Sequence, residues 1–124
     1  MHIIRAAQAP HFEVPGVEFT ALAAPSRGSA GLCTWLLTVA PGLKSPEPHT
    51  LDSDEVFMVV SGTVQLGLDT EALGPGDAAV APAGAPIQLC NPGDQPATVY
   101  VAIRAGFVAQ AADGSLIGTP PWAL

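Results

Sequence analysis

A histidine and a glutamate, His49 and Glu55, are the two side chains in this sequence best suited to chemistry. His49 follows a proline-rich approach, and Glu55 opens an apolar run that ends at Ser61 and Gly62. Between them lies an acidic turn. An imidazole and a carboxylate that meet can transfer a proton, bind a divalent ion or fix each other in place. The sequence therefore predicts a site around these two residues.

The two residues need strands to position them. Proline and glycine at both ends of residues 47–62 predict a strand, a turn and a second strand rather than a helix. Side chains alternate between faces along a strand, so Glu55 shares a face with Phe57, and His49 shares one with Leu51. If these two strands pair across the turn, the imidazole and the carboxylate meet inside the fold.

The composition favours an all-β protein rich in turns. Of the 124 residues, 48% are hydrophobic and 12% are charged, a balance that excludes a disordered, highly charged polymer and fits one domain. Thirteen Gly and thirteen Pro are spread without a triplet period, which excludes collagen. We predict about nine or ten short strands. The main ones cover residues 2–5, 17–22, 31–40, 63–68, 78–81, 87–90 and 98–104, and a C-terminal hairpin turns at 112–115.

The single domain is expected to have three parts. Residues 1–30 should form edge strands and dimer contacts, residues 31–105 the barrel core, and residues 106–124 a hairpin and tail packed on the barrel. The apolar N-terminal strands and a tail that contains Trp122 offer contact surface for a second subunit. We therefore predict a homodimer.

The charges exclude several kinds of partner. The net charge is −7, and the single lysine and three arginines are far apart in sequence, so no basic patch exists for nucleic acid or an anionic membrane. Cys33 and Cys90 have no metal or redox spacing and are interpreted as small hydrophobic residues. No apolar run is long enough to span a bilayer or to serve as a secretory signal. A cytoplasmic protein that binds a small molecule is expected.

Two motifs resemble the sequence boxes of the cupins, which are small double-sheet jelly rolls. The second cupin box reads G, five residues, P-x-G, two residues, H, three residues, N. Here its histidine is replaced by Ile87, and the other positions match as Gly76, Pro82, Gly84 and Asn91. The resemblance covers residues 31–101 and implies an all-β jelly-roll barrel, or double-stranded β-helix.

The first cupin box reads H-x-H, three or four residues, E, six residues, G. His49, Glu55 and Gly62 match it, whereas Leu51 replaces the second histidine. In cupins with the complete set, three histidines and one glutamate hold a divalent metal ion, and open positions accept substrate or dioxygen. The resemblance implies such a site here only through His49 and Glu55. Two ligands rarely hold a catalytic metal, and Leu51 and Ile87 make the cavity drier.

We therefore expect a small cupin with a degenerate metal site that binds a small, partly apolar molecule in its barrel. His49 and Glu55 would act as catalytic residues in proton transfer of an isomerase, cyclase or lyase type. They would use no cofactor or a weakly held divalent metal ion. The expected walls of the ligand site are Trp35, Leu51, Phe57, Ile87, Leu89 and Tyr100.

Other interpretations of these residues stay open. His49 and Glu55 could be a structural pair that closes the barrel mouth. Asp52 or Gln88 could complete a metal site, as in a dioxygenase-like cupin. Tyr100, which shares a face with Arg104, could bind an anion if that face is internal. The barrel could also be filled with side chains, which would give a non-catalytic sensor or structural module.

Overall fold

Nine strands and three short 3-10 turns are the regular elements of the chain in a computed structural model that describes residues 1–124. The 3-10 turns are η1 (Ala6–Gln8), η2 (Pro25–Arg27) and η3 (Pro121–Ala123). The strands are β1 (His11–Val14), β2 (Val17–Ala21), β3 (Leu32–Val39), β4 (Thr50–Leu51), β5 (Glu55–Ser61), β6 (Ala78–Ala81), β7 (Ala97–Arg104), β8 (Ala109–Gln110) and β9 (Leu116–Gly118). The predicted all-β jelly roll is confirmed.

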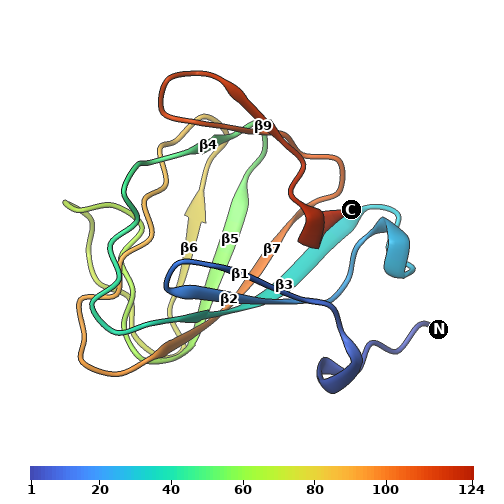
Figure 1. The fold of residues 1–124 in the computed structure, drawn as a ribbon, viewed down its shortest axis with the longest axis horizontal. Helices are drawn as coiled ribbons and strands as arrows, with labels where there is room; N and C mark the ends of the chain where they lie inside the picture. The colour runs from blue at the N-terminus through green and yellow to red at the C-terminus, as the bar shows by residue number, and fades with distance from the viewer.

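The strands form two antiparallel sheets. The larger sheet has the order β1-β2-β3-β7-β5-β6, and the smaller one has the order β4-β8-β9. In Figure 1 the strands of the larger sheet run side by side, and β4 and β9 lie across one end of it. None of the helical segments has the length and apolar character that crossing a bilayer requires.

Strand register arranges the buried side chains in rows across the larger sheet. One row contains Trp35, Val101 and Phe57, because these residues are directly opposite one another on β3, β7 and β5. A neighbouring row contains Cys33, Ile103 and Glu55. All six side chains are buried, and Glu55 is the one ionisable carboxyl among them. The alternation along β5 that the sequence predicted therefore brings Glu55 to the inner face.

Several local predictions differ from the structure. Residues 2–5 form no strand, whereas His11–Val14, which lie outside the predicted strands, form β1. Gly16 has a φ of 79°, which permits a tight turn, so the Pro15-Gly16 pair joins β1 to β2. Residues 63–68 and 87–90 make only isolated bridges, because their partners are loops rather than strands.

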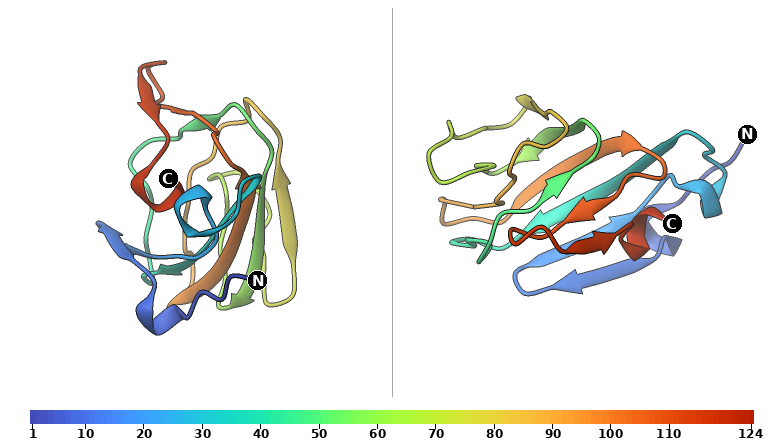
Figure 2. Two further views of the ribbon diagram at one scale, coloured as in Figure 1. Left: turned by 90° about the vertical axis from the view of Figure 1, so that its right-hand side faces the viewer. Right: turned by 90° about the horizontal axis from the view of Figure 1, so that it is seen from above.

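The C-terminal tail packs against β2 and β3. The Trp122 ring stacks on Phe19 with centroids 3.9 Å apart and meets Phe12 edge-on at 6.2 Å. Arg27 Nη2 donates to the Trp122 carbonyl oxygen at 2.8 Å, and Cys33 Sγ donates to the Ala123 carbonyl oxygen at 3.3 Å. Figure 2 shows η3 close to the η2 loop and β3. Trp122 is thus engaged within its own chain.

Candidate functional site

Glu55 is buried in an apolar part of the larger sheet. On β5 it lies between Ile103 of β7 and Ala81 of β6, and it is 4% exposed. Its Oε2 atom is buried and has no hydrogen-bond partner. Burial raises the pKa of the Glu55 carboxyl from 4.5 to about 8, because the charged form loses its hydration. At neutral pH this side chain is therefore a carboxylic acid rather than a carboxylate.

His49 faces the same interior from the opposite side of the barrel. Its backbone N–H donates to the Ile87 carbonyl at 3.0 Å and the Ile87 N–H donates back at 2.8 Å. Residues paired in this way point to one face, and Ile87 is buried, so His49 points inward as well. Burial lowers the pKa of the His49 imidazole, which is half-buried. It is therefore neutral at neutral pH.

His49 and Glu55 do not form the pair that the sequence suggested. The two strands do not pair across the turn, because β4 pairs with β8 while β5 lies between β7 and β6. Glu55 thus lies in the larger sheet, whereas His49 directly precedes β4 of the smaller one, and the one ion pair in the chain joins Arg104 and Asp52 instead. The site contains a protonated acid, Glu55, and an unprotonated base, His49, with no ion pair between them.

The acidic turn between them forms a structural corner. Asp52 Oδ1 accepts hydrogen bonds from the Val108 N–H and Ser53 Oγ, each at 2.9 Å. Arg104 Nη2 donates to Asp52 Oδ2 at 3.3 Å, and the Ala83 N–H donates to Asp54 Oδ1 at 3.0 Å. The Val108 hydrogen bond is the main cause that lowers the pKa of the Asp52 carboxyl. These contacts hold the turn between the two sheets and occupy Asp52.

The residues present do not fit the complete cupin metal centre. Leu51 and Ile87, which replace two of its histidines, are 6% and 3% exposed and belong to the hydrophobic core. Gln88 Nε2, considered as a substitute ligand, donates to the Ser45 carbonyl at 2.6 Å. No three His, Cys, Asp or Glu side chains converge into a group that could hold a metal ion. The donor set is therefore limited to His49 and Glu55.

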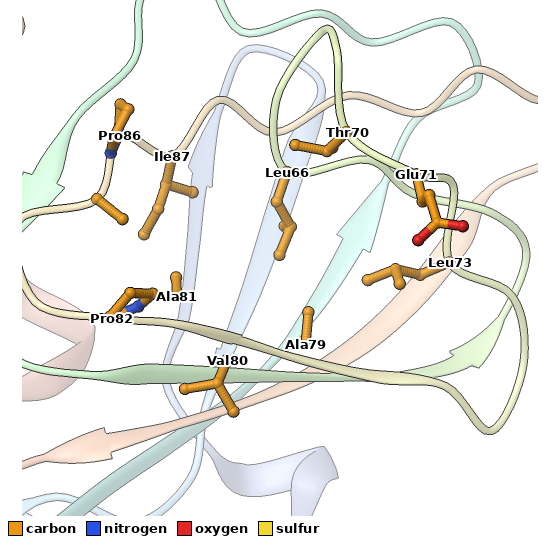
Figure 3. A pocket seen from close by; sticks show the side chains of 11 residues that line it. Leu66, Thr70, Glu71, Leu73, Ala79, Val80, Ala81, Pro82, Pro86 and Ile87 are labelled. Atoms are coloured by element: carbon orange, nitrogen blue, oxygen red, sulfur yellow. The ribbon is translucent and has the colours of Figure 1, made fainter.

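A pocket of about 300 Å³ lies beside β6. Figure 3 shows Leu66 and Leu73 on one side of it, Ala79 and Ala81 on the other, and the Glu71 carboxylate next to Leu73. Its lining comprises Leu66, Thr70, Glu71, Leu73 and residues 79–82 and 85–87.

Two residues of the pocket wall are strand partners of the two candidate residues. Ala81 is directly opposite Glu55 in the β5–β6 ladder, and Ile87 is directly opposite His49. Opposite residues have Cβ atoms about 5 Å apart, so each functional side chain lies beside a lining residue, and neither is itself part of the lining. Alanine leaves little bulk between Glu55 and the pocket.

The predicted wall residues have different positions. Ile87 lines the pocket, whereas Trp35, Leu51 and Phe57 are buried in the hydrophobic core and Leu89 is half-buried against it. The inclusion of Tyr100 is corrected, because it alternates with buried Val99 and Val101 and is 42% exposed on the outer face. Its side chain cannot reach the interior.

Comparison with protein families settles the relationship that the two boxes suggested. A family model described as the cupin domain matches residues 35–103, more than half of the chain. The chain belongs to the cupin family. Among curated proteins, no match is found.

Solved structures similar to this cupin include proteins with different activities. A sugar phosphate isomerase from Silicibacter pomeroyi is 26% identical, with a TM-score of 0.63 over 89% of this chain and 81% of that one. The polyketide cyclase RemF from Streptomyces resistomycificus is 17% identical, with a TM-score of 0.74 over 98% and 88%. Salicylate 1,2-dioxygenase from Pseudoaminobacter salicylatoxidans is 18% identical, with a TM-score of 0.67 over 83% of this chain and 31% of that one. The last two likenesses concern the fold alone.

Proposed function

We propose that this cupin binds a small, partly apolar molecule in the pocket beside β6 and catalyses a proton transfer on it without a resident metal ion. The observation that carries the proposal is the buried Glu55 carboxyl, whose Oε2 atom has no partner. An unpaired buried polar group costs free energy, and functional sites are where such costs are commonly retained. A substrate oxygen would supply the missing partner.

The two candidate residues have complementary roles in such a reaction. Protonated Glu55 donates its proton to a substrate carbonyl oxygen, while neutral His49 takes a proton from the carbon next to that carbonyl. The C–H bond breaks, an N–H and an O–H bond form, and the substrate becomes an enol. His49 then gives its proton to a different carbon while the enol O–H proton returns to Glu55, which completes an isomerisation and restores both residues. No ion pair joins His49 to Glu55, and we propose that the reacting group of the substrate lies between them.

The comparisons support this reaction type only in part. The sugar phosphate isomerase that is 26% identical to this chain catalyses, by its name, an isomerisation. The donor set of His49 and Glu55 supports chemistry that needs an acid and a base rather than a metal-bound oxidant. We therefore favour proton transfer over the dioxygenase-like alternative.

Deuterium exchange tests this proposal. We expect the protein to accelerate incorporation of deuterium from D₂O at the carbon next to the carbonyl of 1-tetralone, a small apolar ketone, as measured by proton NMR. Glu55→Gln and His49→Ala should each lower the acceleration by about 10²–10⁴-fold, the usual contribution of a general acid or base. Glu18→Gln, a matched change of an exposed glutamate on β2, should leave it unchanged.

Two results would contradict the proposal. Exchange no faster than in buffer would favour a non-catalytic sensor or structural module. Exchange that is lost in EDTA and restored by a divalent ion would favour the metal-dependent alternative.

We also propose that the chain forms a homodimer through the outer face of the larger sheet. Leu36, Tyr100 and Met58 are directly opposite one another there, and the last two are 42% and 38% exposed. Val60 and Val80 are exposed on the same sheet. Contiguous exposed apolar side chains are typical of association surfaces. The tail, by contrast, places Trp122 against Phe19 of its own chain.

Light scattering at micromolar concentration tests the dimer. We expect a mass twice the 12.6 kDa of one chain, and the monomer mass for Met58→Glu, because a charge cannot be buried unpaired in an apolar interface. Leu116→Glu, on the exposed β9 hairpin, is the control and should stay dimeric. A monomeric wild-type protein would rule the dimer out.

A further inference from the structure

We infer that the pocket beside β6 takes an uncharged carbonyl compound and excludes phosphorylated and carboxylated molecules. The inference rests on the proposed function, because it assigns a substrate class to the same site. Three features support it: the charges that line the pocket, the positions of the cationic side chains, and the unpartnered Glu55 carboxyl beside the lining residue Ala81.

The pocket lining offers no cationic partner to an anion. Only Thr70 and Glu71 among its residues have polar side chains, and the remainder are aliphatic or proline. Figure 3 shows the Glu71 carboxylate beside Leu73 on the loop side of the pocket. An anionic ligand would therefore lose its hydration next to a carboxylate and apolar walls, which is costly when no cation compensates.

The cationic side chains of the chain all lie elsewhere. Arg104 donates to Ser53 Oγ at 2.5 Å and to Asp52, and Arg27 donates to the carbonyl oxygens of Leu22 and Trp122. Lys44 and Arg5 are exposed, and neither lines the pocket. The helical segments are 3-10 turns of three residues, so no α-helix N-terminus is present to bind a phosphate.

The Glu55 carboxyl beside the pocket lining suits a neutral oxygen acceptor. Glu55 lies directly opposite the lining residue Ala81, its Oε2 atom has no partner, and burial keeps it protonated at neutral pH. A carboxylic acid donates to a ketone or ester oxygen, whereas an anion would add a negative charge close to a group that already resists ionisation. The pocket volume of about 300 Å³ is roughly ten times the share of liquid volume of one water molecule, which fits a molecule of about ten non-hydrogen atoms.

This substrate class differs from that of a similar protein. The enzyme from Silicibacter pomeroyi is, by its name, a sugar phosphate isomerase. A phosphorylated sugar would need a cationic or amide-rich subsite, and the pocket beside β6 has none among its lining side chains. The reaction type can be shared while the substrate is not.

Binding of a matched pair of probes tests the inference. We expect 1-tetralone, an uncharged ketone, to bind the wild-type protein at pH 7 about tenfold or more tightly than 1-naphthoate, an anion of similar size, as measured by isothermal titration calorimetry. Glu71→Lys should strengthen 1-naphthoate binding by about tenfold, because it replaces the one negative charge in the lining with a positive charge. Glu13→Lys, the same change at an exposed position on β1, should not alter the preference.

The outcomes separate this inference from the proposed function. Equal binding of the two probes, or tighter binding of 1-naphthoate to the wild type, would overturn the uncharged substrate class and leave ligand binding in place. If neither probe binds the wild type, or if both bind Ala85→Trp, which narrows the pocket, as tightly as the wild type, the proposed ligand site itself is refuted. Tight 1-tetralone binding that Ala85→Trp abolishes, together with weak 1-naphthoate binding, supports both.

Discussion

Replacing Glu55 with glutamine is expected to stabilise the protein by about 3–5 kcal/mol at pH 9 and to leave its free energy of unfolding nearly unchanged at pH 4. The cause is the burial of this carboxyl, which raises its pKa to about 8 in the folded state. Glutamine has a similar shape and cannot ionise. At high pH the wild-type protein must either keep Glu55 protonated or bury its charge, and both cost free energy. The glutamine variant does not have this cost.

The direction of this pH dependence follows from the protonation of Glu55 in the folded and unfolded states. In the unfolded chain the Glu55 pKa is near 4.5, so between pH 4.5 and about 8 the unfolded state has released the proton and the folded state has not. The unfolded state binds fewer protons there, so the stability of the wild type falls as the pH rises, and it levels off above pH 8. His49 acts in the other direction: because its folded pKa is lowered, its contribution to stability is lost as the pH falls below 6.5.

Urea denaturation at a series of pH values measures this effect. The difference in unfolding free energy between Glu55→Gln and wild type should grow from pH 4.5 to pH 8, whereas the exposed control Glu18→Gln should follow the wild-type curve throughout. Parallel curves for Glu55→Gln and wild type would mean that the carboxyl ionises in the folded protein as it does in water.

Substituting Gly62, the last residue of the first cupin box, should destabilise the folded state strongly. Gly62 has a φ of 76°, and a Cβ atom built on it would lie 2.7 Å from both the Ala97 Cα and the Pro96 carbonyl oxygen. Both are backbone atoms, so the clash cannot be relieved by turning a side chain. We expect Gly62→Ala to lower the free energy of unfolding by about 3–5 kcal/mol, combining the strain of positive φ with overpacking.

Gly42 provides a matched control for this substitution. Its φ is 74°, close to that of Gly62, but a Cβ atom there would meet nothing within 4 Å. Gly42→Ala should therefore cost only about 1–2 kcal/mol for the backbone conformation. Urea midpoints of the two variants isolate the steric part, and equal losses would show that the close approach to Ala97 does not matter.

Residues with strong backbone or alternation signals could be predicted from the sequence. Glu55 and Phe57 share the inner face because burial alternates regularly over residues 55–59 of β5, and Gly84, a glycine of the second box, has a φ of 81°. Asn91, matched only through the second box, is buried and bonded: its Nδ2 donates to the carbonyl oxygens of Val39 and Gln95, and its Oδ1 accepts from the Gly93 N–H. The motif residues therefore specify the fold more than the chemistry.

The remaining features depend on long-range pairing that leaves no local trace. Whether β4 pairs with β5 or with β8 is decided by residues 109–110, which lie far along the chain, so the direct contact of His49 with Glu55 could not be tested from the sequence. The pocket lining includes Ala79 and Ala81, whose small side chains carry no chemical signal. Tyr100 could be on either face until the register of β7 was known.

The ionisation of Glu55 tests the central claim most directly. The claim is that this carboxyl is buried, unpartnered and protonated at neutral pH, with no third ligand that would make it part of a metal centre. The chemical shift of its carboxyl carbon can be followed by ¹³C NMR from pH 4 to pH 10 in chelator-treated protein. We predict a titration midpoint near pH 8. A midpoint at or below the ordinary value of 4.5 would contradict the account.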